Sequence, residues 1–540
     1  MMKMKNIKYI LIAFVITLFY GCVDDLNQYP HIEETSESVY SKAENYLPAL
    51  AKCYASFVTE GQEKGGGNAD LSSNNGYDYM RNYFNLQQAG TDEIASTWIE
   101  GDNIGDLTFL TWDNQDPWIA DMYYRAYYSI SLCNEFLKNS TDDKISGFTE
   151  SQQSEIRSYR AEARFLRAMA YYHAMDLFHN IPFADEDLIG SSKLPEKKTA
   201  AEIFAFIESE LIEAGEELAD AASCEYGHAS RGAAWTLLAR MYLNAETYGV
   251  GNKLEECMTY SQKVIDEGYQ LEEDYAKLFN ADNHKRVGVG HEIIFPLVVD
   301  SESVMSWGAT TYLACGQVDT DEGPDALSLG ISNAWSMFRV RGNFSALFDL
   351  DDGNKSSGDR ALLDKGDNTQ FMPNGVTDRK GGYFVTKWSN LTDDGAIASN
   401  TEVDGVDIDF PMFRLADVYL MYAEAAVRSN VNVAQALDYV NELREKRNAD
   451  TVTENDITKT VDGIPYKFFL DERARELYWE TVRRTDLIRF DSFTSDKYLW
   501  EWKGGVKDGV KVDDRYNVYP IPHTELNANP NMDVSNEKDS

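Results

Sequence analysis

The chain has few cysteines, and their spacing fits neither a metal site nor a disulfide framework. The six cysteines among 540 residues lie at positions 22, 53, 133, 224, 257 and 315, and no two of them are spaced C-x-x-C. Structural zinc sites and small disulfide-rich domains rely on such closely spaced cysteines. The five cysteines after position 22 are therefore predicted to be free thiols packed in the interior. No metal and no cofactor is expected.

Basic residues are also scarce relative to acidic ones. There are 50 Lys and Arg against 90 Asp and Glu, which gives a formal net charge of −40. A nucleic-acid-binding protein needs a basic footprint, because phosphate contacts supply most of its affinity. A nucleic-acid partner is therefore excluded, and anionic lipids or glycans would be repelled unless a local basic patch exists. Neutral molecules, cations and other proteins remain as partners.

Long hydrophobic runs are absent except at the N-terminus. The apolar run Tyr9–Tyr20 (YILIAFVITLFY) follows Lys3, Lys5 and Lys8 and ends before Gly21-Cys22. It is shorter than the roughly 20 residues that a membrane-spanning helix needs. A basic start, a short apolar run and a small residue are typical of a secretory signal, here residues 1–21. The alternative is a buried N-terminal helix.

The cysteine at the end of this run indicates the kind of signal. Gly21-Cys22 resembles a bacterial lipobox, although Phe19 stands where leucine is usual. Cys22 is therefore predicted to carry the lipid, and multiple acyl chains anchor a protein stably. Asp24-Asp25 resembles the surface-export signal of Bacteroidetes lipoproteins. The expected location is the outer membrane, lipid-anchored and facing the cell exterior.

Most of the remaining chain has helical periodicity, arranged in pairs. Residues 231–248 are followed by 253–268, and 413–429 by 432–448; a third pair is expected from 160–178 with 199–218. Small alanines on one helix and an aromatic residue on the next favour tetratricopeptide-like packing. Residues 61–105 and about 280–410 are rich in Gly, Asn and Asp and predict long loops, with short strands at 291–299 and 382–388.

Five segments in order resemble the SusD/RagB family of surface lipoproteins. They are AEARFLRAMAYYHAMDLFHNIPF (161–183), FPMFRLADVYLMYAEAAV (410–427), DERARELYWETVRRTDLIRF (471–490), KYLWEWKGG (497–505) and YPIPHTELNANPNM (519–532). The resemblance implies a mostly α fold, a tetratricopeptide-like helical-pair superhelix with a loop-rich, short-strand ligand-binding lobe. It implies one domain over 22–540, with a helical core at about 40–60, 117–270 and 410–490 and the lobe at about 61–116 and 280–410. It also implies ligand binding without catalysis, and a TonB-dependent transporter as partner.

Common catalytic and nucleotide-binding motifs are missing from the sequence, which agrees with a binding role. The sequence contains no G-x-S-x-G, no G-x-x-x-x-G-K-[ST] and no H-E-x-x-H. DLDDGN (349–354) only partly matches a calcium loop. Acidic residues are so numerous that a glycosidase carboxylate pair stays open. A surface glycoside hydrolase and a protein-binding repeat scaffold are therefore the less favoured alternatives.

Three tryptophans in loop-like contexts are the candidate ligand platforms. Aromatic rings offer flat apolar surface to sugar faces at low entropic cost. Trp98, Trp307 and Trp335 fall where the starch-binding branch of the family has its aromatic arc, and Arg81 falls where that branch has an arginine. The expected ligand is a neutral oligosaccharide, most specifically an α-glucan such as starch or maltooligosaccharide.

Two departures from that branch leave another neutral polysaccharide as the alternative ligand. Ser96 stands where a further aromatic residue is expected, and Gly101 where an asparagine is expected, so that Asp102 or Asn103 would substitute. Core packing is the alternative role for each tryptophan, and a surface ion pair is the alternative for Arg81.

Other aromatic and charged residues are predicted to be structural. Trp500 and Trp502 recur in a motif shared by family members with different ligands. Glu480 is expected to form helix-stabilising ion pairs with Arg483 and Arg484, because these residues have i,i+3 and i,i+4 spacing.

Overall fold

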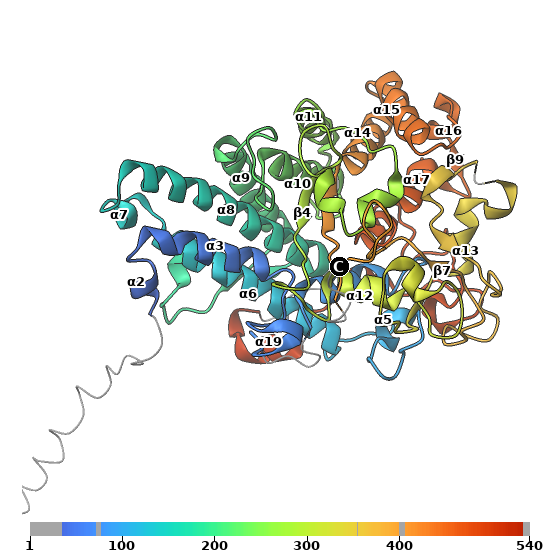
Figure 1. The fold of residues 1–540 in the computed structure, drawn as a ribbon, viewed down its shortest axis with the longest axis horizontal. Helices are drawn as coiled ribbons and strands as arrows, with labels where there is room; N and C mark the ends of the chain where they lie inside the picture. Colours follow the sequence, from blue (N-terminus) through green and yellow to red (C-terminus); the bar gives the residue numbers. More distant parts are fainter. Residues whose placement is uncertain (1–34, 72–76, 354, 399–404, 533–540) are drawn as a thin grey trace, which may run out of the picture.

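The structure is a computed structural model that describes residues 35–71, 77–353, 355–398 and 405–532. The predicted signal at 1–21 and the predicted lipid-bearing Cys22 lie outside the described residues. Helices dominate the described part, and the strands are short. This confirms the predicted mostly α fold with a short-strand lobe. Figure 1 shows the long helices in an array that runs from α8 through α9, α10 and α11 to α14 and α15.

The array is built from helices that each contact the next one along the chain. They are α6 (Pro117–Asn139), α8 (Glu150–Phe178), α9 (Ala200–Glu217), α10 (Arg231–Leu243), α11 (Leu254–Ile265), α14 (Leu415–Ser429) and α15 (Val433–Lys446). Each of the three predicted pairs is present: α8 packs on α9, α10 on α11, and α14 on α15. The pairs continue into one another, because α9 also contacts α10 and α11 contacts α14.

Local sequence explains where these helices begin and how they pack. Thr149 and Thr199 each cap the start of a helix: their side chains accept hydrogen bonds from the backbone N–H groups of Gln152 and Glu202, respectively. The side chains of Gln152 and Glu202 in turn accept from the backbone N–H of the cap residue, so that these backbone N–H groups all have partners. The predicted aromatic residue on the second helix fills the groove in the α14–α15 pair. The Tyr439 ring lies 4.6 Å from that of Tyr419, centroid to centroid.

The remaining helices are shorter and flank the array. They are α2 (Ser36–Val39), α3 (Tyr46–Ala55), α4 (Tyr79–Gln88), α5 (Gly105–Phe109), α7 (Asp142–Ile145), α12 (Ala309–Gly316), α13 (Gly342–Ser345), α16 (Glu454–Thr458), α17 (Lys467–Leu477), α18 (Arg483–Arg489) and α19 (His523–Ala528). In Figure 1, α5, α12 and α13 lie together with β7 in the lower right part of the molecule. This loop-rich part is called the lobe.

The strands form two-stranded antiparallel ladders. They are β1 (Ala95–Ser96) with β5 (Phe338–Arg339), β2 (Ile181–Phe183) with β3 (Glu196–Lys198), β4 (Ile293–Leu297) with β8 (Phe410–Arg414), β6 (Leu363–Asp364) with β7 (Phe384–Val385), and β9 (Thr460–Val461) with β10 (Ile464–Pro465). The predicted strands at 291–299 and 382–388 are confirmed as the shorter β4 and β7. β4 and β8 are buried throughout and join the array to the lobe.

The lobe contains helices where the sequence predicts loops. All ten residues of α4 are buried, and so are all eight of α12. Helix α4 is short, half of its residues are polar, and it follows a Gly- and Asn-rich segment, whereas α12 is buried on every side and shows little amphipathic periodicity, so neither segment stands out as a helix. The prediction of loop for 79–88 was therefore wrong, and Arg81 is held on a rigid helix.

The predicted ion pairs of Glu480 were also wrong. Helix α17 ends at Leu477 and α18 begins only at Arg483, so residues 480 and 483 do not share a helix face. Glu480 instead pairs with Lys387 and Arg414. Arg483 pairs with Asp92, 391 residues away along the chain, and Arg484 donates to the carbonyl of Asn517.

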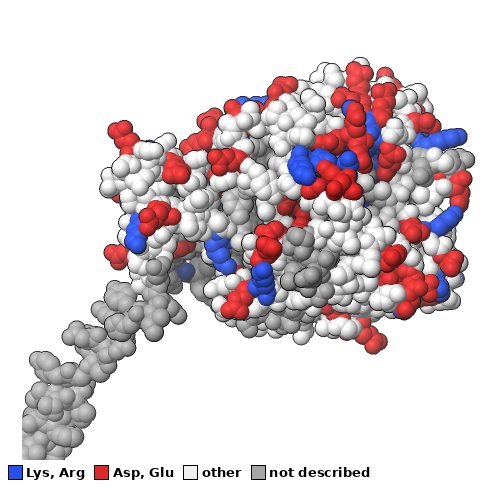
Figure 2. All heavy atoms as spheres, in the orientation of Figure 1, with Lys and Arg blue, Asp and Glu red and all other residues white. Residues whose placement is uncertain are grey.

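Cysteines and surface charge follow the prediction. Among the described residues no cysteine forms a disulfide; Cys53, Cys133, Cys257 and Cys315 are buried, and Cys224 is partly buried. Figure 2 shows acidic side chains spread over one face, with Lys and Arg in small groups among them. Among the described residues, no helix combines the length and hydrophobicity needed to cross a bilayer.

Candidate functional site

The three predicted tryptophans converge on one place in the lobe. The ring centroids of Trp98 and Trp335 are 6.1 Å apart, and the ring planes make an angle of 23°. The Trp335 ring also contacts the Trp307 ring. Their centroids are 6.3 Å apart, and the two ring planes make an angle of 46°. All three side chains are partly exposed. These residues, 98, 335 and 307, are called the tryptophan arc.

Strand pairing brings Trp98 to Trp335. β1 and β5 pair antiparallel with Ala95 opposite Arg339, so the residues after β1 run beside those before β5. The pairing continues beyond the strands, because the Thr97 N–H donates to the Met337 carbonyl at 2.9 Å. The Thr97 hydroxyl also donates to the Ser336 carbonyl at 2.7 Å. Both ring-bearing segments are thereby fixed in register.

Helix α12 positions the other side of the arc. The Trp335 N–H donates to the carbonyl of Cys315, near the end of α12, at 2.9 Å. Trp307 lies just before the start of α12, and its indole Nε1 donates to the carbonyl of Gly65 at 3.1 Å. Gly65 has a φ of 61°, and a Cβ there would lie 3.1 Å from that nitrogen. A glycine is favoured at this turn because the indole packs directly on its backbone.

Arg81 lies beneath the arc, not on its open surface. Only 2% of the residue is exposed. Its guanidinium carbon lies 3.4 Å from the ring centroid of Tyr77 and 4.1 Å from that of Tyr312. Nη1 donates to the Trp307 carbonyl at 3.0 Å. The arginine therefore ties α4 to the segment that carries Trp307, through cation–π contacts and a charge-assisted bond.

Asp102 completes the support around Arg81. Its carboxylate lies 3.2 Å from Arg81 Nη2, and both side chains are buried. Burial raises the pKa of Asp102, and the neighbouring guanidinium opposes that rise. The Trp118 indole N–H donates to the Asp102 carbonyl at 2.8 Å. Asn103, the next residue, is exposed and has a φ of 52°, so its amide faces solvent beside this support.

Two buried carboxyl groups lie behind Trp307. Glu60 accepts from the Trp307 backbone N–H at 3.2 Å. Asp78 caps α4 by accepting from the Arg81 N–H at 2.7 Å, and it also accepts from the Ser306 hydroxyl. Burial, and then repulsion from Asp78, raise the pKa of Glu60 to about 8. Burial also raises the pKa of Asp78, so the simultaneous ionisation of these two neighbouring carboxyl groups is disfavoured in this interior.

Comparison with known proteins identifies the family. The profile described as "SusD family" matches residues 366–537, and the one described as "Starch-binding associating with outer membrane" matches residues 50–243. The chain is 32% identical to the starch-binding protein SusD of Bacteroides thetaiotaomicron, over 98% of this chain and 99% of that protein. This chain belongs to the SusD family. It is also 26% identical to the SusD-like protein P25 of Formosa agariphila, over 98% of both chains.

Solved structures of the SusD superfamily have the same fold. A SusD superfamily protein from Bacteroides vulgatus superposes with a TM-score of 0.66 at 20% identity, covering 91% of this chain and 98% of that one. A SusD-like carbohydrate binding protein from Bacteroides fragilis superposes with a TM-score of 0.67 at 17% identity, covering 92% and 100%. These likenesses establish the SusD-like fold and confirm the predicted architecture.

Two tyrosines of the candidate site were not predicted from the sequence. Tyr77 and Tyr312 clamp Arg81, but neither was singled out. Tyr312 lies on the buried helix α12, within a range that was predicted to form long loops. Tyr77 lies four positions before Arg81, and this nearness along the chain was the available clue. Trp500 is fully buried and Trp502 is partly buried and donates to the Met372 carbonyl, as expected for structural residues.

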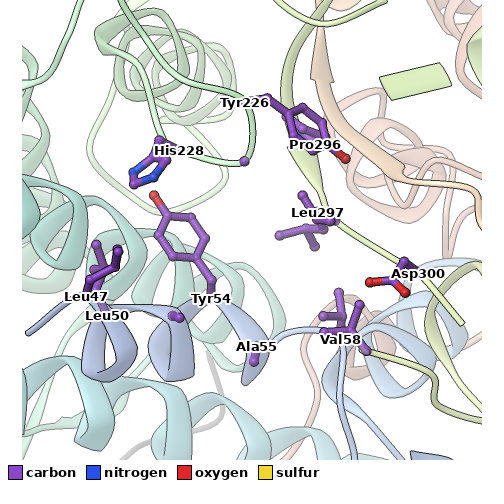
Figure 3. Close-up of a pocket in the computed structure, with 14 residues that line it drawn as sticks. Leu47, Leu50, Tyr54, Ala55, Val58, Tyr226, His228, Pro296, Leu297 and Asp300 are labelled. Atoms are coloured by element: carbon purple, nitrogen blue, oxygen red, sulfur yellow. The ribbon is translucent and has the colours of Figure 1, made fainter. Parts of the chain in front are cut away.

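A separate apolar pocket lies where the helical array meets β4. Figure 3 shows Leu47, Leu50 and Tyr54 of α3 on one side and Pro296 and Leu297 of β4 on the other. The cavity has a volume of about 320 Å³. Its walls are mostly aliphatic, with His228 and Asp300 at the margin. None of the arc residues lines it, so it is a different feature from the tryptophan arc.

The arc is suited to binding. Its working surfaces are indole rings, which have no nucleophile and no titrating group. Within the described ranges, no group of three or more His, Cys, Asp or Glu side chains is placed to hold a metal ion. The arc can therefore bind a ligand by stacking of its indole rings on apolar faces of that ligand, with polar groups at the edge of the arc.

Proposed function

We propose that the protein captures a neutral oligosaccharide at the cell surface and delivers it to a TonB-dependent outer-membrane transporter. The observation that supports this most is the convergence of three partly exposed tryptophan rings, each within 6.3 Å of its neighbour. The name of its relative from Bacteroides thetaiotaomicron, a starch-binding protein, favours an α-glucan as the ligand. The protein is a binding protein and not an enzyme, in keeping with how its relatives are named.

The geometry suits a sugar chain for a physical reason. The ring planes of Trp98 and Trp335 differ by 23° and those of Trp335 and Trp307 by 46°, so the row of rings is not flat. A curved row of rigid rings loses little entropy when a curved chain of apolar sugar faces stacks on it. Arg81 acts in this proposal as a positioning residue for Trp307, and exposed Asn103 as a hydroxyl partner at the edge.

The ligand class can be tested by affinity electrophoresis with a panel of neutral polysaccharides. Calorimetry with maltoheptaose then measures the affinity for an α-glucan. Retardation by starch and amylopectin is expected, without release of reducing ends. Retardation only by a different neutral glycan would replace the α-glucan with that glycan, an outcome that Ser96 and Gly101 favour because they depart from the starch-binding pattern. No retardation by any polysaccharide would overturn glycan binding.

The proposed anchor is a lipid on Cys22, on the outer membrane and facing outward. The family description associates its members with the outer membrane. The Cys22→Ala variant is expected to leave the fold intact and release the protein from the membrane fraction. A variant that is still cleaved and stays firmly in that fraction would contradict the lipid anchor.

A further inference from the structure

A second pocket lies in the lobe, away from the tryptophan arc. Its volume is about 430 Å³, within the range of small-ligand sites. It is formed where the loop at 369–373 meets the start of α13 and the turn at 501–508. The residues that matter for its chemistry are Thr369, Gln370, Phe371, Glu501, Lys507 and Asp508. It is called the Phe371 pocket.

An aromatic ring stands in this pocket with much of its surface in solvent. Phe371 is 48% exposed, and among the described residues it is the one phenylalanine or tryptophan with so large an exposed fraction. The ring is nevertheless held in place: it packs on Gly342 of α13 so closely that a Cβ on that glycine would overlap it. One side of the ring therefore rests on backbone, and the other is free to take a planar apolar partner.

The loop that carries the ring is fixed by buried hydrogen bonds. The Glu501 carboxylate is buried and accepts the N–H groups of Gly342 and Met372, at 2.7 and 2.8 Å. The Gln370 amide donates to the Ser345 hydroxyl at 3.2 Å. These bonds join the loop, α13 and the 501–508 turn, so the platform is preorganised before a ligand arrives.

The rim of the pocket is polar and carries both charge signs. Lys507 and Asp508 are exposed there. A lysine ammonium provides three donors and a carboxylate provides acceptors, the two kinds of group that sugar hydroxyls need. A ligand with a net charge would meet attraction from one of the pair and repulsion from the other. A neutral, hydroxyl-rich ligand would use both.

The pocket and the arc are connected through the same small packing cluster. Met372, next to Phe371, packs with Ala95 of β1, the strand that leads to Trp98. The pocket therefore belongs to the same rigid part of the lobe as the arc. A branched or long polysaccharide offers many copies of one unit, so a second site raises the effective concentration at the first.

We propose that the Phe371 pocket is a second, weaker saccharide-binding site that takes one or two neutral sugar units. The proposal rests on the proposed function, because it assumes that the arc binds glycan. The Phe371 ring is the stacking platform, and Lys507 and Asp508 bond the hydroxyls. Because the pocket has one aromatic ring and the arc has three, the pocket binds a short oligosaccharide more weakly than the arc does. Its main contribution is to the affinity of the protein for long polysaccharides.

Saturation-transfer NMR with maltotriose and with matched galactose-, mannose- and xylose-based trisaccharides tests the site. The Trp98→Ala/Trp335→Ala variant removes most of the arc and is expected to retain a weak signal with at least one probe. Adding Phe371→Ala should reduce that signal to background, whereas adding Leu327→Ala, at another exposed apolar side chain, should not. Adding Lys507→Ala and Asp508→Ala to the arc variant should weaken its saturation-transfer signal, although the Phe371 ring is left in place.

The outcomes separate the two proposals. No signal from the wild type with any probe overturns glycan binding, and this site with it. Signal from the wild type but none from the arc variant overturns the second site alone, as does a signal that persists after Phe371→Ala. In affinity electrophoresis, Phe371→Ala in the intact arc should weaken binding to polymer about tenfold, the usual effect of losing one anchor. Melting temperatures of the variants check that the fold is unchanged.

Discussion

The helical array and the lobe both bury charged side chains, but they use them differently. Where β4, β8, α15 and α17 meet, Arg414 pairs with Glu292 at 2.8 Å and Glu476 at 2.6 Å, and Arg447 contacts the same two carboxylates. All four side chains are at most 1% exposed. Below the arc, Arg81 has a single carboxylate partner, and aromatic rings occupy the rest of its surroundings.

Tryptophans of the interior, including Trp388 of the lobe, differ in the same way from those of the arc. Trp118, Trp388, Trp479 and Trp500 are fully buried. Trp98, Trp307 and Trp335 keep part of their rings in solvent, although strand pairing and backbone bonds hold them in place. The closed charge network stabilises the fold, and the incomplete burial at the arc leaves surface for a ligand. Mutations should therefore separate stability from binding.

Breaking the closed network should give the largest effect. Although burial opposes it, Arg447 and Arg414 lower the pKa of Glu476 to about 2. Glu476→Ala would leave three buried guanidiniums short of a partner, since Arg360 also contacts Glu476. We expect the free energy of unfolding to fall by about 3–5 kcal/mol in urea titration. Glu213→Ala, at an exposed ion pair, is the control and should cost less than about 1 kcal/mol.

Truncating the arc should affect binding and spare stability. Trp98→Ala and Trp335→Ala should each weaken maltoheptaose binding by about 1–3 kcal/mol in calorimetry, and the double variant should nearly abolish it. Melting temperatures should change little. Trp235→Ala, at a partly buried tryptophan of α10, is the matched control and should bind normally. Unchanged affinity with a lowered melting temperature would mean that the arc is core packing.

Arg81 tests whether a residue below the arc shapes it. Arg81→Lys keeps the charge but loses the forked geometry that reaches both the Trp307 carbonyl and Asp102. We expect affinity to fall about tenfold, or about 1.4 kcal/mol, with a small loss of melting temperature. Arg157→Lys, at an exposed pair with Asp142, should change neither. Equal behaviour of the two variants would remove Arg81 from the site.

The smallest effect is expected at the pair of partly exposed His228 and buried Glu162, beside the apolar pocket of Figure 3. His228 Nδ1 lies 3.0 Å from Glu162, and this hydrogen bond raises the pKa of His228. A raised folded-state pKa contributes stability that is complete below about pH 6.5 and is lost as pH rises through the folded value. Melting from pH 5 to 9 should show a decline that His228→Gln flattens, worth at most about 1 kcal/mol. Parallel profiles for the two proteins would refute this linkage.

Much of the fold could be predicted, because paired amphipathic helices show themselves in local spacing. Residues 231–268 and 413–448 gave both helices of each pair, and Tyr439 was placed in its groove. The tryptophans of the arc were found because they lie in segments without helical spacing. The buried helices α4 and α12 were missed: α4 is short and half polar and follows a Gly- and Asn-rich segment, and α12 is buried on every side and has little periodicity.

The sequence by itself determined the helical pairs, the acidic character, the free cysteines and the choice of Trp98, Trp307 and Trp335. The first three depend on composition and on neighbours a few residues apart, whereas the tryptophans were chosen by their loop-like setting and by the resemblance to the starch-binding branch of the family. Only the tertiary structure decided that Arg81 lies under the arc between Tyr77 and Tyr312, and that Arg483 pairs with Asp92, 391 positions away. The partner of a buried charged side chain depends on how segments from the whole chain pack together, so it cannot be predicted from the spacing of nearby residues.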